Sequence, residues 1–388
     1  MSTYRVEQVK EFLKKNGCDI AIFNRVENVV LLSGGYWPRN GLSFAVIPAE
    51  GKPALVVPSP EKEDVTPGYK HFQIMDYGTV LIRGGDSTEN LKQVFQSLKT
   101  LWNLPSQAII AYEKYVAVSA PSLCDGEVTL TGRNTHALIE EAFDGKEVVD
   151  IEPYIEEIRT CKTPDEIEKI RMANRMGYVG IAKFKELLDS GQPLTEIGLG
   201  AAVESEIAVK AHEYGVRYAR AWAQITSGLR TVDAWKAGLV TTDKPIEDGD
   251  LVMLEMCTAA DGYFSDLTCT WKRGQIDAKK QEMLDLIDRS QEAARMQCGK
   301  GKRAVDAFQA AYDICKEAGY EEYFLHGIGH GTGWSYHDGR PGIGPGSEDI
   351  FEVGMIHSVE PGIYVPGVGG VRQEVNVVET EDGCEILK

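Results

Sequence analysis

The 388-residue sequence has no apolar run that approaches the roughly eighteen residues needed to cross a membrane. Its first residues, MSTYRVEQVKEFLKKNG, also lack the apolar stretch of a secretory signal and carry Arg5, Lys10, Lys14 and Lys15 instead. We therefore expect a cytoplasmic protein without a membrane partner.

Positive charge and paired cysteines are scarce as well. Lysine and arginine number 41 against 59 aspartates and glutamates, which gives a formal net charge of -18. Most of such a surface would repel a phosphate backbone, so we expect no nucleic-acid partner and favour a small peptide or small-molecule substrate. The eight cysteines form no close pair at metal-ligand or redox-motif spacing, and we interpret them as reduced thiols.

The length favours two domains, because a single hydrophobic core rarely extends over so many residues. In residues 1–150, short apolar runs alternate with amphipathic stretches, which predicts an α/β domain. Strands are expected at 20–23, 29–32, 42–47, 54–57 and 108–111, and helices at 4–16, 89–103 and 134–143.

A second domain is expected over residues 151–388. Thr163, Pro164 and Glu166 have the pattern of a capped helix start, with proline at the first helical position. Further on, glycine-punctuated strands are expected near the end of the chain. The remaining predictions are helices at 164–189, 194–214, 277–298 and 303–318, and strands at 251–256 and 263–271.

Two segments of this second domain have the pattern of hairpins with one acidic residue on each strand. In the first, a turn centred on residues 260–261 would place Glu255 opposite Asp266. In the second, Glu360 and Glu374 would be opposed in the same way. Carboxylates about 5 Å apart repel by about 3 kcal/mol at an effective dielectric constant near 20. Two divalent cations would balance four such carboxylates, so the pattern indicates a metal centre.

Four of the seven histidines fall within 32 residues, at His326, His330, His337 and His357. In HGIGHGTGW, glycines alternate with larger residues, which puts His326 and His330 on one face of an extended chain and leaves the other face bare for close approach. These two histidines would lie about 13 Å apart, too far to share one ion. We expect one to be a ligand and the other to act beside the ion or the substrate.

Four motifs, SDLT at 265–268, HGIGHGTG at 326–333, SVEPGIY at 358–364 and GGVRQE at 369–374, occur in this order. Together they closely resemble the creatinase, aminopeptidase P, prolidase and methionine aminopeptidase superfamily over residues 150–388. The earlier residues resemble the N-terminal domain of creatinase and prolidase more loosely. The resemblance implies an α+β fold, with a pita-bread catalytic domain at 151–388, a smaller α/β domain at 1–150, and a homodimer.

The same resemblance implies a role for individual residues. Glu360 would orient or deprotonate the bridging water, and His326 and His337 would stabilise an oxyanion or shuttle a proton beside the scissile bond. Arg372 would support Glu374. Two divalent ions, Mn, Co or Zn, would be held by Glu255, Asp266, His330, Glu360 and Glu374.

Three departures from the superfamily pattern bear on the function. Glu255 stands where aspartate is usual, and its extra methylene moves the carboxylate outward. Cys269 stands where metallopeptidase relatives commonly carry arginine. The histidine that aminopeptidase P and creatinase have near the position of Gly238 is missing, since no histidine lies between His212 and His326.

These features leave three functional hypotheses. The retained ligand positions favour a metal-dependent C–N hydrolase, an Xaa-Pro peptidase of the aminopeptidase P or prolidase type. Glu255 and the missing histidine favour a metal-free small-molecule hydrolase that resembles creatinase or ectoine hydrolase. A non-catalytic binding module is the third hypothesis, and it gives no reason to keep four carboxylates and a histidine in register.

Overall fold

The computed structural model describes residues 2–38, 42–65, 68–78, 86–113, 133–145, 147–236 and 240–388. Contacts within the chain define two compact units, and the main boundary lies between Arg159 and Thr160. No helix in the described ranges is long and apolar enough to span a membrane. The cysteines in these ranges are free thiols, while Cys124 lies outside them.

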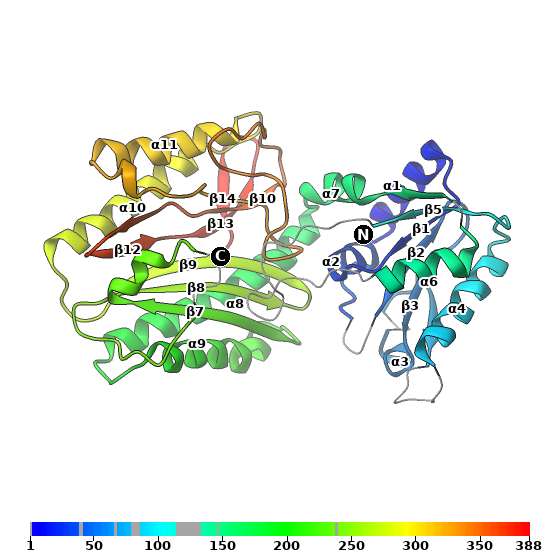
Figure 1. Cartoon of the computed structure of the whole chain (residues 1–388), viewed down its shortest axis with the longest axis horizontal. Coiled ribbons are helices and arrows are strands. Elements are labelled where there is room, and N and C mark those ends of the chain that lie inside the picture. The colour runs from blue at the N-terminus through cyan, green and yellow to red at the C-terminus, as the bar shows by residue number, and fades with distance from the viewer. Residues whose placement is uncertain are drawn as a thin grey trace. The chain divides into compact units, whose positions relative to one another are not determined.

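The first unit is built on a mixed sheet in the order β4-β3-β2-β1-β5-β6 (Figure 1). Helices α4 and α6 cover one face, where they bury Phe95 and Phe143 against Ile20 and Phe44 of the sheet. The strands are β1 Ile20–Phe23, β2 Phe44–Pro48, β3 Ala54–Pro58, β4 Gln73–Tyr77, β5 Ile109–Tyr112 and β6 Glu147–Asp150. The helices are α1 Ser2–Asn16, α2 Val26–Ser33, α3 Lys62–Val65, α4 Ser87–Leu101, α6 Arg133–Phe143 and α7 Glu152–Thr160.

One predicted strand of this unit is wrong. Residues 29–32 form part of α2, which ends where the Gly34 N–H donates to the Val30 carbonyl at 3.0 Å. Gly34 has φ +82°, a left-handed conformation that is typical of the residue that caps a helix C-terminus. Nearly every residue of α2 is buried, and a short run that is apolar on all sides does not distinguish a strand from a buried helix.

The second unit contains a sheet in the order β7-β8-β9, a sheet in the order β10-β13-β14, and the pair β11-β12. The strands are β7 Ala219–Ser227, β8 Leu251–Ala260, β9 Tyr263–Lys272, β10 Ile356–Val359, β11 Gly362–Val365, β12 Gly369–Arg372, β13 Val375–Glu379 and β14 Cys384–Ile386. The helices are α8 Pro164–Asp189, α9 Glu196–Lys210, α10 Ala278–Met296 and α11 Ala304–Glu317.

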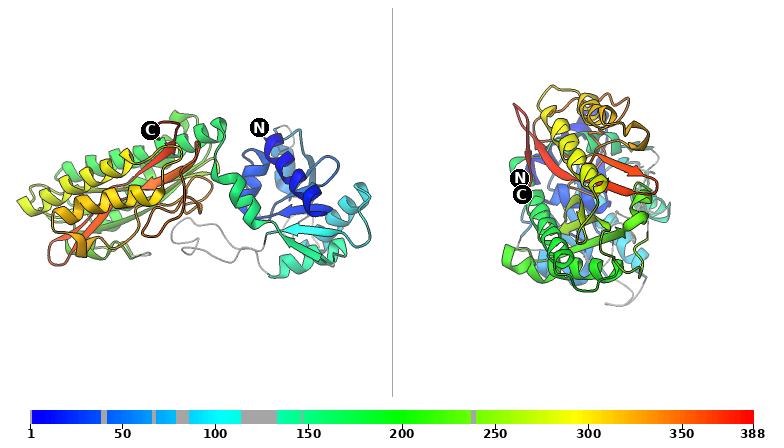
Figure 2. Two further views of the ribbon diagram at one scale, coloured as in Figure 1. Left: turned by 90° about the horizontal axis from the view of Figure 1, so that it is seen from above. Right: turned by 90° about the vertical axis from the view of Figure 1, so that its left-hand side faces the viewer.

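The strands of this unit lie between two pairs of helices (Figures 1 and 2). Helix α8 packs on β8 and β9 and α9 packs on β7, whereas α10 packs on β10, β11 and β12. The strands of this unit are thereby covered on both sides.

Helix α8 begins at Pro164 as predicted, and the Thr163 N–H donates to the Glu166 carboxylate at 2.8 Å.

The edge of β9 meets the C-terminal strands. The Glu374 N–H donates to the Thr268 carbonyl at 2.9 Å, and the Arg372 N–H donates to the Thr270 hydroxyl at 3.0 Å. These bonds set β9 beside the segment that leads from β12 into β13. As a result, the acidic residues of the two predicted hairpins lie next to one another.

Candidate active site

The first acidic hairpin forms, but with a register that differs from the prediction. Glu255 pairs with Thr268 and Asp266 pairs with Cys257, because the turn consists of residues 261–262 rather than 260–261. Both turn residues have positive φ, +48° and +93°, and an Asp-Gly pair favours this geometry. The partner shift is two residues, so Glu255 and Asp266 still point to the same face of the sheet.

The second acidic register is confirmed. Before Glu360 along the chain, Ile356 pairs with Val378, and after it Gly362 pairs with Arg372. Both pairs continue the alignment that sets Glu360 against Glu374. Neither glutamate belongs to a named strand, since β10 ends before Glu360 and β13 begins after Glu374.

The alternating glycines of 326–333 allow close backbone contact, as predicted. A Cβ atom at Gly329 would overlap the Ser358 carbonyl oxygen. In the structure, the Ser358 N–H donates to the His330 carbonyl at 2.9 Å and the Glu360 N–H donates to the Ile328 carbonyl at 2.8 Å. This contact brings His330 alongside Glu360.

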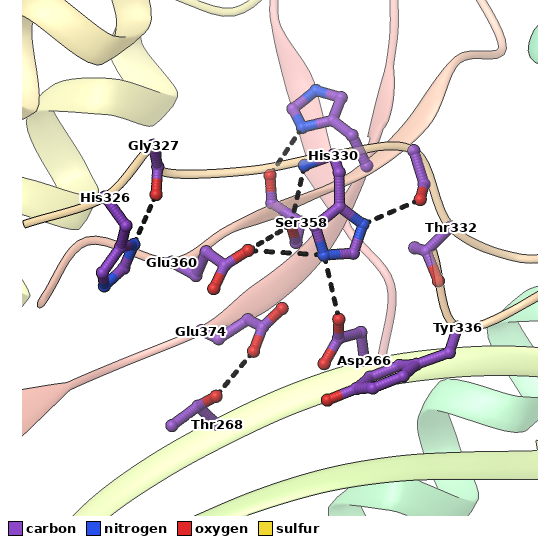
Figure 3. Close-up of polar contacts among 12 residues, drawn as sticks. Asp266, Thr268, His326, Gly327, His330, Thr332, Tyr336, Ser358, Glu360 and Glu374 are labelled. Atoms are coloured by element: carbon purple, nitrogen blue, oxygen red, sulfur yellow. Dashed lines mark hydrogen bonds and ion pairs between the residues drawn. The ribbon is translucent and has the colours of Figure 1, made fainter. Parts of the chain in front are cut away.

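The imidazole of His330 lies between two carboxylates (Figure 3). Its Nε2 atom is 3.2 Å from Asp266 Oδ2 and 3.4 Å from Glu360 Oε1. Two sets of three donor atoms lie within 4.8 Å of one another and share Asp266. They are Asp266, His330 and His337, and Glu255, Asp266 and Glu374.

Thr268 joins the two glutamates of the second set. Its hydroxyl lies 2.6 Å from Glu255 Oε2 and 2.7 Å from Glu374 Oε2. A hydroxyl has one proton, so it serves one of these oxygens at a time. Glu374 is buried, and its other oxygen, Oε1, has no hydrogen-bond partner among the described residues.

Arg372 contacts a different carboxylate from the one expected. It was expected to support Glu374, but its Nη2 atom forms an ion pair with Glu255 Oε2. Its Nη1 atom donates to the Tyr364 hydroxyl at 2.9 Å. The longer side chain of Glu255 allows its carboxylate to reach the guanidinium.

His326 lies apart from this carboxylate cluster. Its Nε2 atom is 2.9 Å from the Tyr364 hydroxyl and its Nδ1 atom is 2.5 Å from the Gly327 carbonyl. Burial lowers the pKa of His326, which keeps the ring neutral at physiological pH. His337 instead packs against His330, with the ring centroids 4.3 Å apart and the ring planes tilted by 40°.

Glu360 lies among other carboxylates, and its pKa is shifted as a result. Burial and the charge of Glu374 raise the pKa of Glu360 well above its ordinary value. Asp266 adds to this effect, whereas His330 opposes it. Among the described residues, Arg372 supplies a permanent positive charge, paired with Glu255 and with its Nε atom 3.9 Å from Glu360 Oε2. Four carboxylates therefore exceed the nearby positive charge.

These observations fit a site for divalent cations. Hard cations bind carboxylate oxygens, and imidazole is a common ligand for Zn, Co and Mn ions. The buried Oε1 of Glu374 lacks a hydrogen bond, and an ion would satisfy it. The two donor sets that share Asp266 are therefore candidate ligands for divalent cations.

Comparison with known families agrees with this geometry. The profile of metallopeptidase family M24 matches residues 168–381, and the profile of the creatinase/prolidase N-terminal domain matches residues 5–161. The chain belongs to metallopeptidase family M24.

Individual relatives cover most of this M24 chain. The Xaa-Pro dipeptidase of Pyrococcus furiosus is 29% identical over 314 residues, which span 80% of this chain and 86% of that protein. A solved structure of prolidase from Pyrococcus furiosus has a TM-score of 0.77 at 26% identity and covers 97% of this chain and 98% of its own. For an X-Pro aminopeptidase from Thermotoga maritima MSB8 the TM-score is 0.76 at 25% identity, with coverage of 96% and 95%.

These likenesses confirm the superfamily and the fold class predicted from the sequence. The chain is an α+β protein in which a smaller α/β unit precedes an M24 pita-bread unit. It is a hydrolase by its membership of the family.

The sequence prediction missed two residues of the M24 site, Thr268 and Tyr336. Tyr336 is buried beside His337, and its hydroxyl donates to Glu255 Oε1. The strand alternation that placed Asp266 on the inner face also places Thr268 there, so this signal was present. Tyr336 follows the glycine-rich segment in an irregular stretch, where no periodicity indicates its direction.

One of the two remaining departures, Cys269, can be located on the M24 fold. Cys269 lies between two inward-facing threonines of β9 and therefore points to the opposite face, where burial raises its pKa to about 11. The position near Gly238, where the superfamily histidine is missing, lies outside the described residues.

Proposed function

We propose that this chain is a metal-dependent hydrolase of C–N bonds that cleaves an Xaa-Pro peptide bond. The main support is the convergence of four carboxylates and His330 around buried oxygens, of which Glu374 Oε1 has no hydrogen-bond partner in the described chain. The relatives named above as Xaa-Pro dipeptidase, prolidase and X-Pro aminopeptidase give the substrate class.

The proposed ligands are the five residues that the sequence singled out. His330 and Glu360 would serve one ion and Glu255 and Glu374 the other, with Asp266 between them. When bound, divalent ions act as Lewis acids toward the scissile carbonyl and the attacking water. We propose Mn, Co or Zn as the metal.

Glu360 is proposed to transfer a proton from the attacking water to the leaving nitrogen. As a carboxylate beside the proposed ions, it would accept a proton as water adds to the carbonyl carbon and release that proton to the leaving nitrogen. The C–O bond forms, the C–N bond breaks, and the proton from water ends on the amine. Hydrolysis then needs no further acid.

His326 is proposed to act through its hydrogen bond with Tyr364. With the neutral ring donating from Nδ1 to the Gly327 carbonyl, Nε2 accepts from the Tyr364 hydroxyl, which in turn accepts from Arg372. These bonds hold the ring beside the cluster, where it would orient the substrate or the developing oxyanion. His337, whose ring packs against that of His330, is proposed to contact the substrate from the other side.

One observation favours a second candidate function, a metal-free hydrolase of a small molecule. Glu255 already has three partners, namely Arg372, Thr268 and Tyr336, and so is partly neutralised without any ion. A site of this kind would use the carboxylates directly as acids and bases.

Elemental analysis of the purified protein, followed by a substrate panel, separates the two candidates. The panel contains Xaa-Pro dipeptides and tripeptides, with creatine and ectoine alongside. Metal-dependent cleavage of an Xaa-Pro substrate supports the proposal. Cleavage of creatine or ectoine by protein that contains no metal would replace it with the second candidate.

A further inference from the structure

Two cysteines that the proposed reaction does not use meet at the end of α10. Cys298 lies two residues beyond the last residue of this helix, and Cys384 is the first residue of β14. The Cys298 sulfur is 3.7 Å from the Ala294 carbonyl oxygen, and the Cys384 sulfur is 3.7 Å from that of Arg295. Because these two carbonyls follow one another in the last turn of α10, the two thiols lie at the same end of the helix.

Backbone contacts hold the segments of the two cysteines together. The turn after α10 packs on the turn between β13 and β14, where the Lys300 N–H donates to the Thr380 carbonyl at 3.1 Å. A Cβ atom at Gly299 would lie 3.1 Å from the Gly383 nitrogen, and each of these glycines adjoins one of the cysteines. A disulfide needs its two Cα atoms within about 7 Å, and close backbone contact beside both cysteines favours such an approach.

The two thiols differ in exposure and in acidity. Cys298 is buried, whereas Cys384 is partly exposed on β14, the edge strand of its sheet. The Cys298 thiol donates a hydrogen bond to the Cys384 sulfur, which lowers the pKa of Cys384 and raises that of Cys298. The positive charges of Arg295 and Lys302 also favour the Cys384 thiolate, and Glu379 opposes it. Cys384 is therefore the thiol that an oxidant would reach first, with Cys298 placed to react second.

We propose that Cys298 and Cys384 form a reversible redox-modification site, at which a peroxide converts the two thiols into a disulfide between α10 and β14. A dithiol reductant would restore the thiols. The bond would close a loop over residues 298–384, which contains the proposed ligands His330, Glu360 and Glu374. The site itself consists of two thiols and does not depend on the proposed metal function.

The oxidation takes two steps. The Cys384 sulfur bonds to one oxygen of hydrogen peroxide, the O–O bond breaks, and the departing hydroxide takes the Cys384 proton to become water. The Cys298 sulfur then attacks the Cys384 sulfenic acid, so that the S–S bond forms and the S–O bond breaks. The second hydroxide leaves with the Cys298 proton as water. Two sulfur atoms thus give up two electrons, and the peroxide accepts them.

The test treats reduced, full-length protein with a twofold excess of hydrogen peroxide. Free thiols are counted in denaturant after the peroxide is removed, and a non-reduced digest is mapped by mass spectrometry. Wild type should lose two of its eight thiols and give a cross-linked peptide that joins Cys298 to Cys384. Dithiothreitol should restore all eight. This measurement needs no variant and so does not depend on whether a substituted chain folds.

Variants separate the roles of the two thiols. Cys298→Ser should stop the reaction after its first step, so dimedone should capture Cys384 as a sulfenic acid. Cys384→Ser should slow thiol loss by about tenfold or more, because Cys298 is buried. Cys315→Ala is the matched control, since Cys315 is a buried thiol of α11 whose pKa burial raises to about 11. It should form the Cys298–Cys384 disulfide as wild type does.

Two results would overturn the proposal. A wild-type digest without the Cys298–Cys384 peptide after peroxide treatment would remove the site, whatever metal the protein contains. Thiol loss in Cys384→Ser at the wild-type rate would show that Cys384 is not the thiol that reacts first. Neither result bears on the proposed hydrolase function, which the metal content and the substrate panel test separately.

Discussion

Two clusters in the second unit look alike when only distances are compared. One contains Asp266, His330 and His337, and the other, which we call the buried cluster, contains Cys298, His357 and Glu379. In each, three donor atoms lie within 4.8 Å of one another. The hydrogen bonds distinguish them.

The buried cluster satisfies its polar atoms internally. His357 Nε2 lies 2.7 Å from Glu379 Oε1, and its Nδ1 lies 2.9 Å from the Ser358 carbonyl. Glu379 Oε2 accepts from the Gly299 N–H at 2.6 Å. The candidate active site instead contains carboxylates in excess, and one oxygen of Glu374 has no hydrogen bond from any residue that the structure describes. The paired atoms of the buried cluster fit a structural role, whereas the unpaired oxygen beside an excess of carboxylates fits an ion site.

The largest expected effect is on turnover. Glu360→Gln keeps the shape of the side chain but removes the charge and the proton acceptor, so kcat should fall by about 10³-fold or more, together with metal content. Steady-state assays on an Xaa-Pro substrate and elemental analysis measure both. Glu322→Gln, on the exposed surface, is the control and should behave as wild type. Full activity in Glu360→Gln would remove this residue from the mechanism.

His326→Ala should lower kcat by about 10²–10⁴-fold, the range typical of a positioned acid–base group or oxyanion donor. Its metal content should stay that of wild type, because the ring contacts Tyr364 and Gly327 rather than the cluster. Tyr364→Phe, which removes only the hydroxyl, should show a smaller loss. If His326→Ala loses metal while it keeps its fold, His326 is a metal ligand and the proposed roles of His326 and His330 are wrong.

His357→Ala tests the opposite side of the comparison. It leaves Glu379 buried without one of its hydrogen bonds, which should lower the free energy of unfolding by about 3 kcal/mol. Metal content should not change. The exposed His212→Ala is the control, with an expected change within about 0.5 kcal/mol. Denaturant unfolding gives both values, and metal loss in His357→Ala with the fold intact would make the buried cluster a metal site.

Removal of metal should destabilise the folded protein. An ion that binds only the folded chain adds about 2.7 kcal/mol at a free concentration one hundred times its dissociation constant. Thermal melts with and without chelator should therefore differ, and added Mn²⁺ should reverse the change. Identical melts on protein that contains metal would show that the ion does not favour the folded state.

The smallest expected effect is a pH dependence in the metal-free protein. Burial and Glu374 raise the pKa of Glu360 above its usual 4.5, so between these two pKa values the folded chain holds a proton that the unfolded chain has released. Stability from this residue is therefore greatest below pH 4.5 and falls as pH rises through the folded pKa, by at most about 1.4 kcal/mol per pH unit. In chelator, wild type should lose stability relative to Glu360→Gln over this interval. A difference that does not vary with pH would contradict the raised pKa.

Much of the fold and the site follows from the sequence because the relevant signals are local. Helix α8 begins at the proline and capping residues that predicted its start. The alternating glycines at 326–333 allow the close backbone contact that places His330 beside Glu360. The register of β8 and β9 depended on which two residues turn, and the Asp-Gly pair at 261–262 was the better signal. The error preserved the inward face, so the cluster was still predicted.

The contacts of Glu255 could not be predicted in this way. Tyr336 and Arg372 reach it from segments far apart in the chain, and no periodicity relates them. The prediction of a strand at 29–32 was wrong for another reason. Burial on every side of α2 removes the amphipathic pattern that identifies a helix.

The most direct test of the account is a crystal structure of the protein with Mn²⁺, with anomalous scattering measured to locate the metal. The account predicts anomalous peaks among Asp266, His330 and Glu360 and beside Glu255 and Glu374, and none at the buried cluster of Cys298, His357 and Glu379. A peak at the buried cluster, or no peak among Asp266, His330 and Glu360 at saturating Mn²⁺, would contradict it.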